Sequence, residues 1–141
     1  MNGNVRYSVH DDLPPEARLV DDGLGAANDQ AAPLHEVRPL SCFARLDSGR
    51  VIGGAVGRTW GRCGELQQLW VDSAHRRKGI GTRLVKEFEA RAQARGCRIF
   101  YLETFNFQTP QLYRALGYEV RYEHTVYPYG IVKYIMVREQ D

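Results

Sequence analysis

The sequence predicts a single α/β domain whose mixed sheet has about six or seven strands. Its 141 residues, of which 43% are hydrophobic and 26% charged, have the size and composition of one globular domain. Stretches of β-forming residues alternate with stretches whose apolar residues recur at helical spacing. Strands and helices that alternate in this way are typical of the α/β class. We therefore expect residues 1–141 to fold as one domain around one sheet.

The N-terminal third carries weaker signals than the rest of the chain. Residues 5–10 alternate apolar and polar side chains, which predicts a first strand. The acidic and proline residues at 12–16 are typical of the start of a helix. That helix has an incomplete apolar stripe, interrupted by Gly23 and Gly25, and we expect a loop at residues 28–33.

A hairpin and a third strand are expected next. Residues 39–46 and 51–59 are predicted to be strands joined by a polar turn that contains glycine. Several glycines weaken the second of these strands, which indicates a bulge or the close approach of another backbone segment. A further strand is predicted at residues 65–71, where the sequence is mostly apolar.

The most informative segment is a basic, glycine-containing turn at the start of the longest predicted helix. Apolar residues at helical spacing predict this helix over residues 79–95, with Gly96 as its left-handed cap. The first turn of a helix leaves backbone N–H groups unpaired, and the helix dipole favours anions there. Gly79 and Gly81 let a ligand approach the backbone closely, and Arg76, Arg77 and Lys78 add positive charge. The segment therefore predicts a diphosphate-binding site.

Three strands and a short helix are expected in the remainder of the chain. Residues 98–105 are rich in β-forming residues and predict a buried strand. Thr109 can cap a short helix whose first residue is Pro110. Residues 118–124 and 131–137 alternate apolar and polar side chains and predict two final strands.

Charge and composition exclude several functional classes. A formal net charge of +2 is weak for a polyanion-binding protein, so no nucleic-acid partner is expected. The 3 cysteines lie far apart and the 4 histidines have no ligand spacing, so neither a disulfide framework nor a metal site is expected. The chain shows no run of about 20 apolar residues and no signal peptide. We expect a cytoplasmic protein without a membrane partner.

Two motifs carry a resemblance to a known family. The residues from Arg76 to Gly81 (RRKGIG) fit the pattern Arg/Gln-x-x-Gly-x-Gly/Ala. Asn106, Tyr113 and the Gly117-Tyr118 pair are similar to a second family segment, in which Thr109 replaces a small apolar residue. Over roughly residues 50–120 the chain resembles the GNAT superfamily of acetyl-CoA-dependent N-acetyltransferases, in particular a subgroup of small bacterial single-domain proteins.

The resemblance implies a fold and a coenzyme site. A mostly antiparallel sheet flanked by helices is expected, in which the parallel central strands at 65–71 and 98–105 splay apart. The pantetheine arm of acetyl-CoA would pair with the first of these strands, and its diphosphate would lie on the 76–81 loop. The residues implied to contact the coenzyme come from this strand, this loop and the second motif: Leu69, Trp70, Val71, Arg76, Arg77, Lys78, Gly79, Ile80, Gly81, Thr82, Asn106 and Tyr113.

Two residues are candidates for proton transfer. Tyr113 matches the family tyrosine that acts as an acid toward the departing coenzyme A sulfur, and a tyrosine is protonated at neutral pH. Alternatively, Tyr113 is a core residue of a short amphipathic helix. Glu65 is a candidate base toward the incoming ammonium, or else a solvated carboxylate at a strand end. Without a side-chain base the amine would bind in its neutral form, and a backbone N–H near Trp70 or Val71 could stabilise the oxyanion.

These observations together predict an N-acetyltransferase. An acetyl group would pass from acetyl-CoA to a primary amine of a small molecule or peptide by direct attack in a ternary complex. A non-catalytic acyl-CoA-binding regulatory module and a basic RNA-binding domain are the alternatives. Tyr127 and Tyr129, which flank a proline, are candidates for acceptor contact, while the last strands could instead form the seam of a homodimer.

Overall fold

The computed structural model describes residues 3–141. They form two compact units, of which the first ends at residue 35 and the second comprises residues 36–141. The first unit contains one helix, α1 (Ala17–Ala31), whose first turn is closed by the carbonyl of Pro14, and none of its residues is buried. The prediction of a strand at residues 5–10 is wrong, because this segment has no partner strand to complete its backbone hydrogen bonds. The predicted loop at 28–33 begins too early, since α1 continues through residue 31.

The second unit, residues 36–141, is built on one six-stranded sheet. The strand order is β1-β2-β3-β4-β6-β5, and the strands are antiparallel apart from the parallel pair β3 and β4. The predicted mostly antiparallel sheet of six or seven strands is confirmed. The strands are β1 (Arg38–Arg45), β2 (Val51–Trp60), β3 (Cys63–Val71), β4 (Ile99–Phe105), β5 (Glu119–His124) and β6 (Lys133–Glu139).

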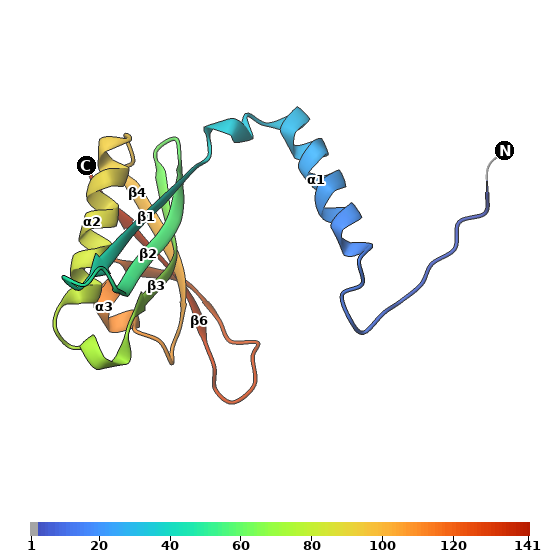
Figure 1. Ribbon diagram of the computed structural model, residues 1–141. Helices are drawn as coiled ribbons and strands as arrows, with labels where there is room; N and C mark the ends of the chain where they lie inside the picture. Colours follow the sequence, from blue (N-terminus) through green and yellow to red (C-terminus); the bar gives the residue numbers. More distant parts are fainter. Residues whose placement is uncertain (1–2) are drawn as a thin grey trace. The chain divides into compact units, whose positions relative to one another are not determined.

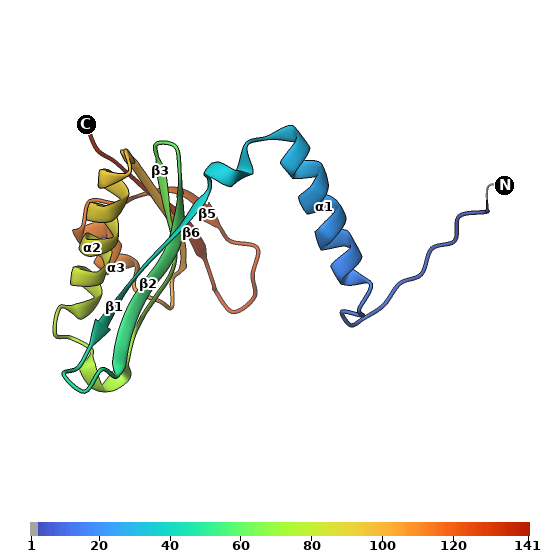
Figure 2. The ribbon, with the colours of Figure 1, turned by 45° about the horizontal axis from the view of Figure 1, so that its top comes forward.

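Two helices cover one face of this sheet (Figure 1, Figure 2). They are α2 (Ile80–Ala94) and α3 (Pro110–Ala115), and short 3-10 turns lie at η1 (Leu34–Glu36) and η2 (Ser73–His75). The apolar stripe of α2, with Leu84, Val85 and Phe88, packs against buried side chains of the strands. Within residues 36–141 no α-helix covers the opposite face of the sheet, and we call it the open face of this unit.

The helix boundaries follow from backbone chemistry. Gly79 and Gly96 flank α2 with φ of 78° and 99°, as expected for glycines at the two ends of this helix. The predicted cap of α3 is wrong in one respect, since the Thr109 side chain makes no capping hydrogen bond. Pro110 nevertheless begins α3, because its missing N–H needs no partner at the first helical position.

A bulge bends β3 beside its partner β2. Val56 pairs with Gln68 and Gly57 with Leu66, so that Gln67 is an extra residue in β3. Gly57 allows the two backbones to approach here, because a Cβ at this position would lie 1.9 Å from the carbonyl oxygen of Glu65. The glycine-rich strand therefore meets a bulge, as the sequence predicted.

The parallel strands β3 and β4 separate immediately beyond this bulge. Their pairing runs from Cys63–Ile99 to Leu66–Leu102, although both strands continue further. We call the opening between residues 67–71 of β3 and residues 103–105 of β4 the notch. The predicted splay of the central strands is thus confirmed.

A buried charged network ties α2 to the C-terminal strands. The Tyr118 hydroxyl donates a hydrogen bond to Glu89 Oε2 over 2.7 Å, and Arg138 forms an ion pair with Glu89 Oε1 at 3.1 Å. Glu89 is buried, so its charge is stabilised by these two partners in place of water.

Within residues 3–141 there is no helix with the length and apolar character needed to cross a bilayer.

Candidate active site

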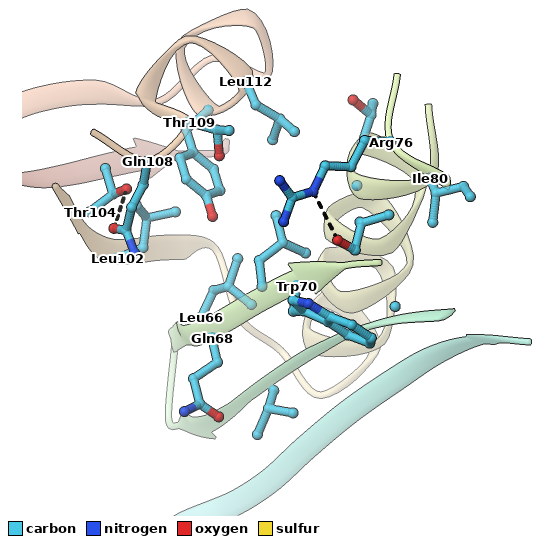
Figure 3. Close-up of a pocket in the computed structure, with 18 of the residues that line it drawn as sticks. Leu66, Gln68, Trp70, Arg76, Ile80, Leu102, Thr104, Gln108, Thr109 and Leu112 are labelled. Carbon is cyan, nitrogen blue, oxygen red and sulfur yellow. Dashed lines mark hydrogen bonds between the residues drawn. The ribbon is translucent and has the colours of Figure 1, made fainter. Parts of the chain in front are cut away.

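A cavity of about 1120 Å³ occupies the notch. Its two main walls come from β3 and from the end of β4 with α3, and the start of α2 closes one end (Figure 3). Figure 3 shows Leu66, Gln68 and Trp70 on the β3 side and Thr104, Gln108 and Leu112 on the other. Most residues expected to contact the coenzyme line this cavity: Leu69, Trp70, Val71, Arg76, Arg77, Gly79, Ile80, Gly81, Thr82 and Tyr113.

The loop before α2 presents unpaired backbone amides. Arg77 and Gly79 adopt left-handed conformations, with φ of 64° and 78°, between residues with negative φ. Such alternation turns successive N–H groups toward one concave side and creates an anion-binding nest. Among the described residues, no acceptor is bonded to the amides of residues 79–82. The loop and the first turn of α2 therefore form a site that fits a diphosphate.

Side chains around Asp72 hold this loop in place. The Asp72 carboxylate binds Arg50 at 3.1 Å and lies 3.4 Å from His75 Nδ1. The Asp72 amide donates to the carbonyl of Ile52, so the end of β3 is fixed to β2. Arg76 folds back and donates from Nε to the carbonyl of Val71 over 3.0 Å, as Figure 3 shows. These contacts preorganise the loop before a ligand binds.

Tyr113 contributes a phenol from the α3 side of the cavity. Its side chain is buried, and its ring packs edge-on against Tyr118 with centroids 5.9 Å apart. Burial raises the pKa of Tyr113 to about 12. The hydroxyl has no hydrogen-bond partner among residues 3–141, so it is available to a ligand in the cavity. Tyr113 is therefore a neutral hydrogen-bond donor at physiological pH.

Three residues proposed from the sequence lie outside this cavity. Glu65 is on the open face, where its carboxylate accepts a hydrogen bond from Arg58 Nε over 2.8 Å. Lys78 lines a smaller neighbouring depression between α2 and β1. The Asn106 side chain closes the β5–β6 hairpin, accepting from the Val132 amide and donating to the carbonyl of Gly130. The coenzyme roles of Lys78 and Asn106 and the base role of Glu65 stay predictions.

The structure adds cavity residues that sequence reasoning missed. Glu103 and Phe107 line the notch at the end of β4, and His75 lines it beside the loop. Thr104 and Gln108 are joined by a hydrogen bond of 3.0 Å, and Gln108 also accepts from the Phe105 amide, which fixes the turn after β4. In the sequence, Glu103 is a lone carboxylate in an apolar strand. It reaches the cavity only because β4 separates from β3 at this position, which the sequence does not reveal.

The three thiols are not part of the cavity. Burial raises the pKa of Cys42, Cys63 and Cys97, which keeps each of them protonated. None of them lines the notch. In the described part of the chain, no three histidine, cysteine or acidic side chains come together as metal ligands.

Comparisons with known proteins agree with this geometry. Residues 7–118 match the model of the acetyltransferase (GNAT) family. The blasticidin-S acetyltransferase of Streptomyces morookaense is 32% identical over 136 residues, which cover 94% of this chain and 93% of that protein.

Solved structures share the fold. An acetyltransferase from Bacillus cereus superposes with a TM-score of 0.77 at 23% identity, covering 94% of this chain and 97% of its own. A Bacillus anthracis protein assigned as a streptothricin acetyltransferase, solved in complex with acetyl coenzyme A, has a TM-score of 0.65 at 22% identity and covers 74% of this chain and 64% of its own. With a family match over most of its length and a relative of this identity and coverage, the chain belongs to the GNAT family of acetyltransferases and is an N-acyltransferase.

Proposed function

We propose that this enzyme transfers the acetyl group of acetyl-CoA to a primary amine of a small molecule, by direct attack of the amine in a ternary complex. The observation that carries the proposal is the row of unpaired amides at residues 79–82, at the mouth of a cavity that continues between two splayed strands. GNAT acetyltransferases use acetyl-CoA, and a diphosphate with a long narrow arm suits a site of this shape.

The unpaired edge of β3 offers backbone groups to the pantetheine arm. Residues 68–71 pair with β2 on one side and have no β4 partner on the other. An extended arm that adds to this edge would run from the loop toward the apex of the notch, which brings the thioester between the two strands. A backbone N–H near Trp70 or Val71 would then stabilise the oxyanion of the tetrahedral intermediate.

Tyr113 serves the leaving group in this proposal. When the tetrahedral intermediate collapses, the C–S bond breaks and the sulfur leaves with the electron pair. Its negative charge is stabilised by a hydrogen bond from the Tyr113 phenol, whose pKa of about 12 keeps the proton on the phenol oxygen. The positively charged nitrogen of the intermediate loses one proton to solvent to give the neutral amide, and the thiolate takes one proton from solvent to give the free thiol.

The acceptor class is supported by a relative. The 32% identical protein is a blasticidin-S acetyltransferase, so a small-molecule amine is the acceptor that we propose for this chain as well. Direct transfer is supported by the thiols, since Cys42, Cys63 and Cys97 lie outside the cavity and are kept protonated by burial.

The coenzyme site can be tested with a matched pair of variants at one position. Thr82 is in the first turn of α2, where proline is tolerated but removes one amide donor. Thr82→Pro should weaken acetyl-CoA binding about tenfold or more, which is the expected loss for one hydrogen bond to a charged group. Thr82→Ala keeps the amide and should bind nearly as the wild type does. Binding is measured by titration calorimetry.

The rival function is a non-catalytic acyl-CoA-binding module. It shares the coenzyme site, so acetyl-CoA would raise the melting temperature in both cases. Only the enzyme releases free coenzyme A when amines are added, which a thiol reagent detects. Equal affinity in Thr82→Pro and Thr82→Ala would contradict the amide site, whereas tight binding without thiol release from any amine would favour the module.

A further inference from the structure

Glu103 is at the apex of the notch and faces the open side of the sheet. It is the first residue of β4 beyond the last pair with β3, which joins Leu66 to Leu102. Its neighbours Leu102 and Thr104 are buried beneath the helices, so the alternation of side chains along a strand directs Glu103 to the open face. Tyr113 approaches the same cavity from the helical side.

Charge is divided between the two ends of the cavity. Arg76 and Arg77 line the end at the loop, and Glu103 is the single carboxylate among the described residues that line the cavity. A site with an anion-binding end and one acidic residue at the other end suits a reaction between an anionic coenzyme and a cationic acceptor.

The Glu103 carboxylate keeps most of its hydrogen-bonding capacity. Lys133 Nζ forms an ion pair with Glu103 Oε2 at 3.8 Å, a separation that is beyond hydrogen-bond distance, so the carboxylate can still accept hydrogen bonds from a second cation. The same Lys133 ammonium also lies over the rings of Phe105 and Tyr127, at 5.3 and 5.8 Å from their centroids. Phe107 stacks on Phe105 and lines the cavity with an exposed ring. An acceptor cation at Glu103 would thus meet free carboxylate lone pairs beside an aromatic surface.

Chemistry decides which nitrogen of the acceptor binds there. The nitrogen that attacks the thioester must be neutral, whereas a nearby carboxylate stabilises an ammonium and raises its pKa. Binding of the reacting nitrogen at Glu103 would therefore slow the reaction.

From this conflict we infer that the enzyme acts on dibasic acceptors, in which Glu103 holds a second, non-reacting cation while the reacting amine lies in the notch beside the thioester. This inference rests on the proposed acetyl transfer and specifies its acceptor class. Short diamines and amines that also carry a guanidinium group belong to this class.

The experiment compares α,ω-diamines of two to six carbons with monoamines of equal chain length, following coenzyme A release. For at least one chain length the wild type should show a kcat/KM about tenfold or more higher for the diamine, since a charge-assisted hydrogen bond at a half-exposed carboxylate contributes at this level. Glu103→Gln should bring the two values close to each other, chiefly through the KM of the diamine. Glu123→Gln is the matched control, because Glu123 lies on β5 opposite Tyr134 and outside the cavity, and it should keep the preference.

The outcomes separate this inference from the proposed function. A wild type without preference at any length, or a Glu103→Gln variant that retains it, overturns the inference. An equal fall in kcat for monoamines and diamines would make Glu103 a partner of the reacting nitrogen and also overturns it. If no amine of the series is acetylated, calorimetric binding of diamines to the coenzyme A complex decides, and equal binding by wild type and Glu103→Gln overturns it. Failure of acetyl-CoA to bind or of any amine to release coenzyme A would count against the proposed function itself.

Discussion

Replacing Tyr113 by phenylalanine tests the leaving-group role with the smallest possible change. The substitution removes one oxygen from a side chain that is 6% exposed and keeps the ring that packs against Tyr118 at 5.9 Å. The hydroxyl has no partner among the described residues, so its loss breaks no internal hydrogen bond. We therefore expect the free energy of unfolding of Tyr113→Phe to stay within about 1 kcal/mol of the wild type.

The expected kinetic effect follows from the pKa of the phenol. Burial raises that pKa to about 12, whereas a departing alkyl thiolate has a conjugate-acid pKa of roughly 8.5. Complete proton transfer from Tyr113 to the sulfur would be uphill by about 3.5 pKa units, so Tyr113 acts mainly as a hydrogen-bond donor. Removing one such donor to a developing anion costs about 100-fold in kcat, or about 2.7 kcal/mol. The KM for acetyl-CoA should change little, because the bond forms only as charge develops.

The assay is a steady-state measurement of coenzyme A release from pH 6 to 9. Because Tyr113 does not ionise in this range, the profiles of wild type and Tyr113→Phe should be parallel and separated by a constant factor. Tyr118→Phe is the control, since it removes a buried hydrogen bond to Glu89 without touching the cavity. It should lower the free energy of unfolding by about 1.5–3 kcal/mol and leave kcat unchanged. A Tyr113→Phe enzyme with wild-type kcat would refute the reasoning.

Three further predictions concern stability and the placement of single residues. Asn106→Ala should lower the melting temperature by loosening the β5–β6 hairpin. We expect an unchanged calorimetric Kd for acetyl-CoA, because the side-chain amide is already bonded within the hairpin, and a large rise in Kd would support the coenzyme role that the motif predicts. Gly57→Ala should destabilise the fold by about 3 kcal/mol in urea titrations, because the added Cβ would lie 1.9 Å from the Glu65 carbonyl oxygen and 2.8 Å from Phe88. An unchanged free energy of unfolding would disprove this close approach. The raised pKa of Tyr113 contributes stability that is fully present below pH 10, which is the pKa of a tyrosine in the unfolded chain, and that is lost as the pH rises toward about 12. The urea midpoint of the wild type should therefore fall over this pH range, and that of Tyr113→Phe should fall less.

The parts of the fold that the sequence predicted correctly are those with local causes. Gly79 and Gly96 occupy left-handed positions that an L side chain rarely adopts, so they mark the ends of α2 from the sequence alone. The strands around the hairpin follow the alternation of their own side chains, and the loop at 76–82 follows from cations and glycines within one short stretch.

The parts that were wrong or missed depend on distant partners. An alternating segment such as residues 5–10 is a strand only if another strand completes its hydrogen bonds, and none does so in the structure. The bonds of the Asn106 side chain to Gly130 and Val132 were missed, because they join residues more than 20 positions apart, while its coenzyme role stays a prediction. Glu103 gains its position from the point at which β4 leaves β3, a feature of two strands that are far apart in the chain.

The separation of β3 and β4 also bears on why two substrates could meet without a covalent intermediate. A parallel pair that stayed closed would place Tyr113 and Glu103 on opposite faces of a continuous sheet, with no passage between them. Because the pairing stops at Leu66 and Leu102, both side chains line one cavity from opposite faces. A thioester held at the apex would therefore present one face of its carbonyl to an amine arriving past Glu103 and direct its sulfur toward Tyr113. In that arrangement the amine would approach from one side of the thioester and the sulfur would leave toward the other. Proximity alone can then supply much of the rate, and a nucleophilic side chain is not required.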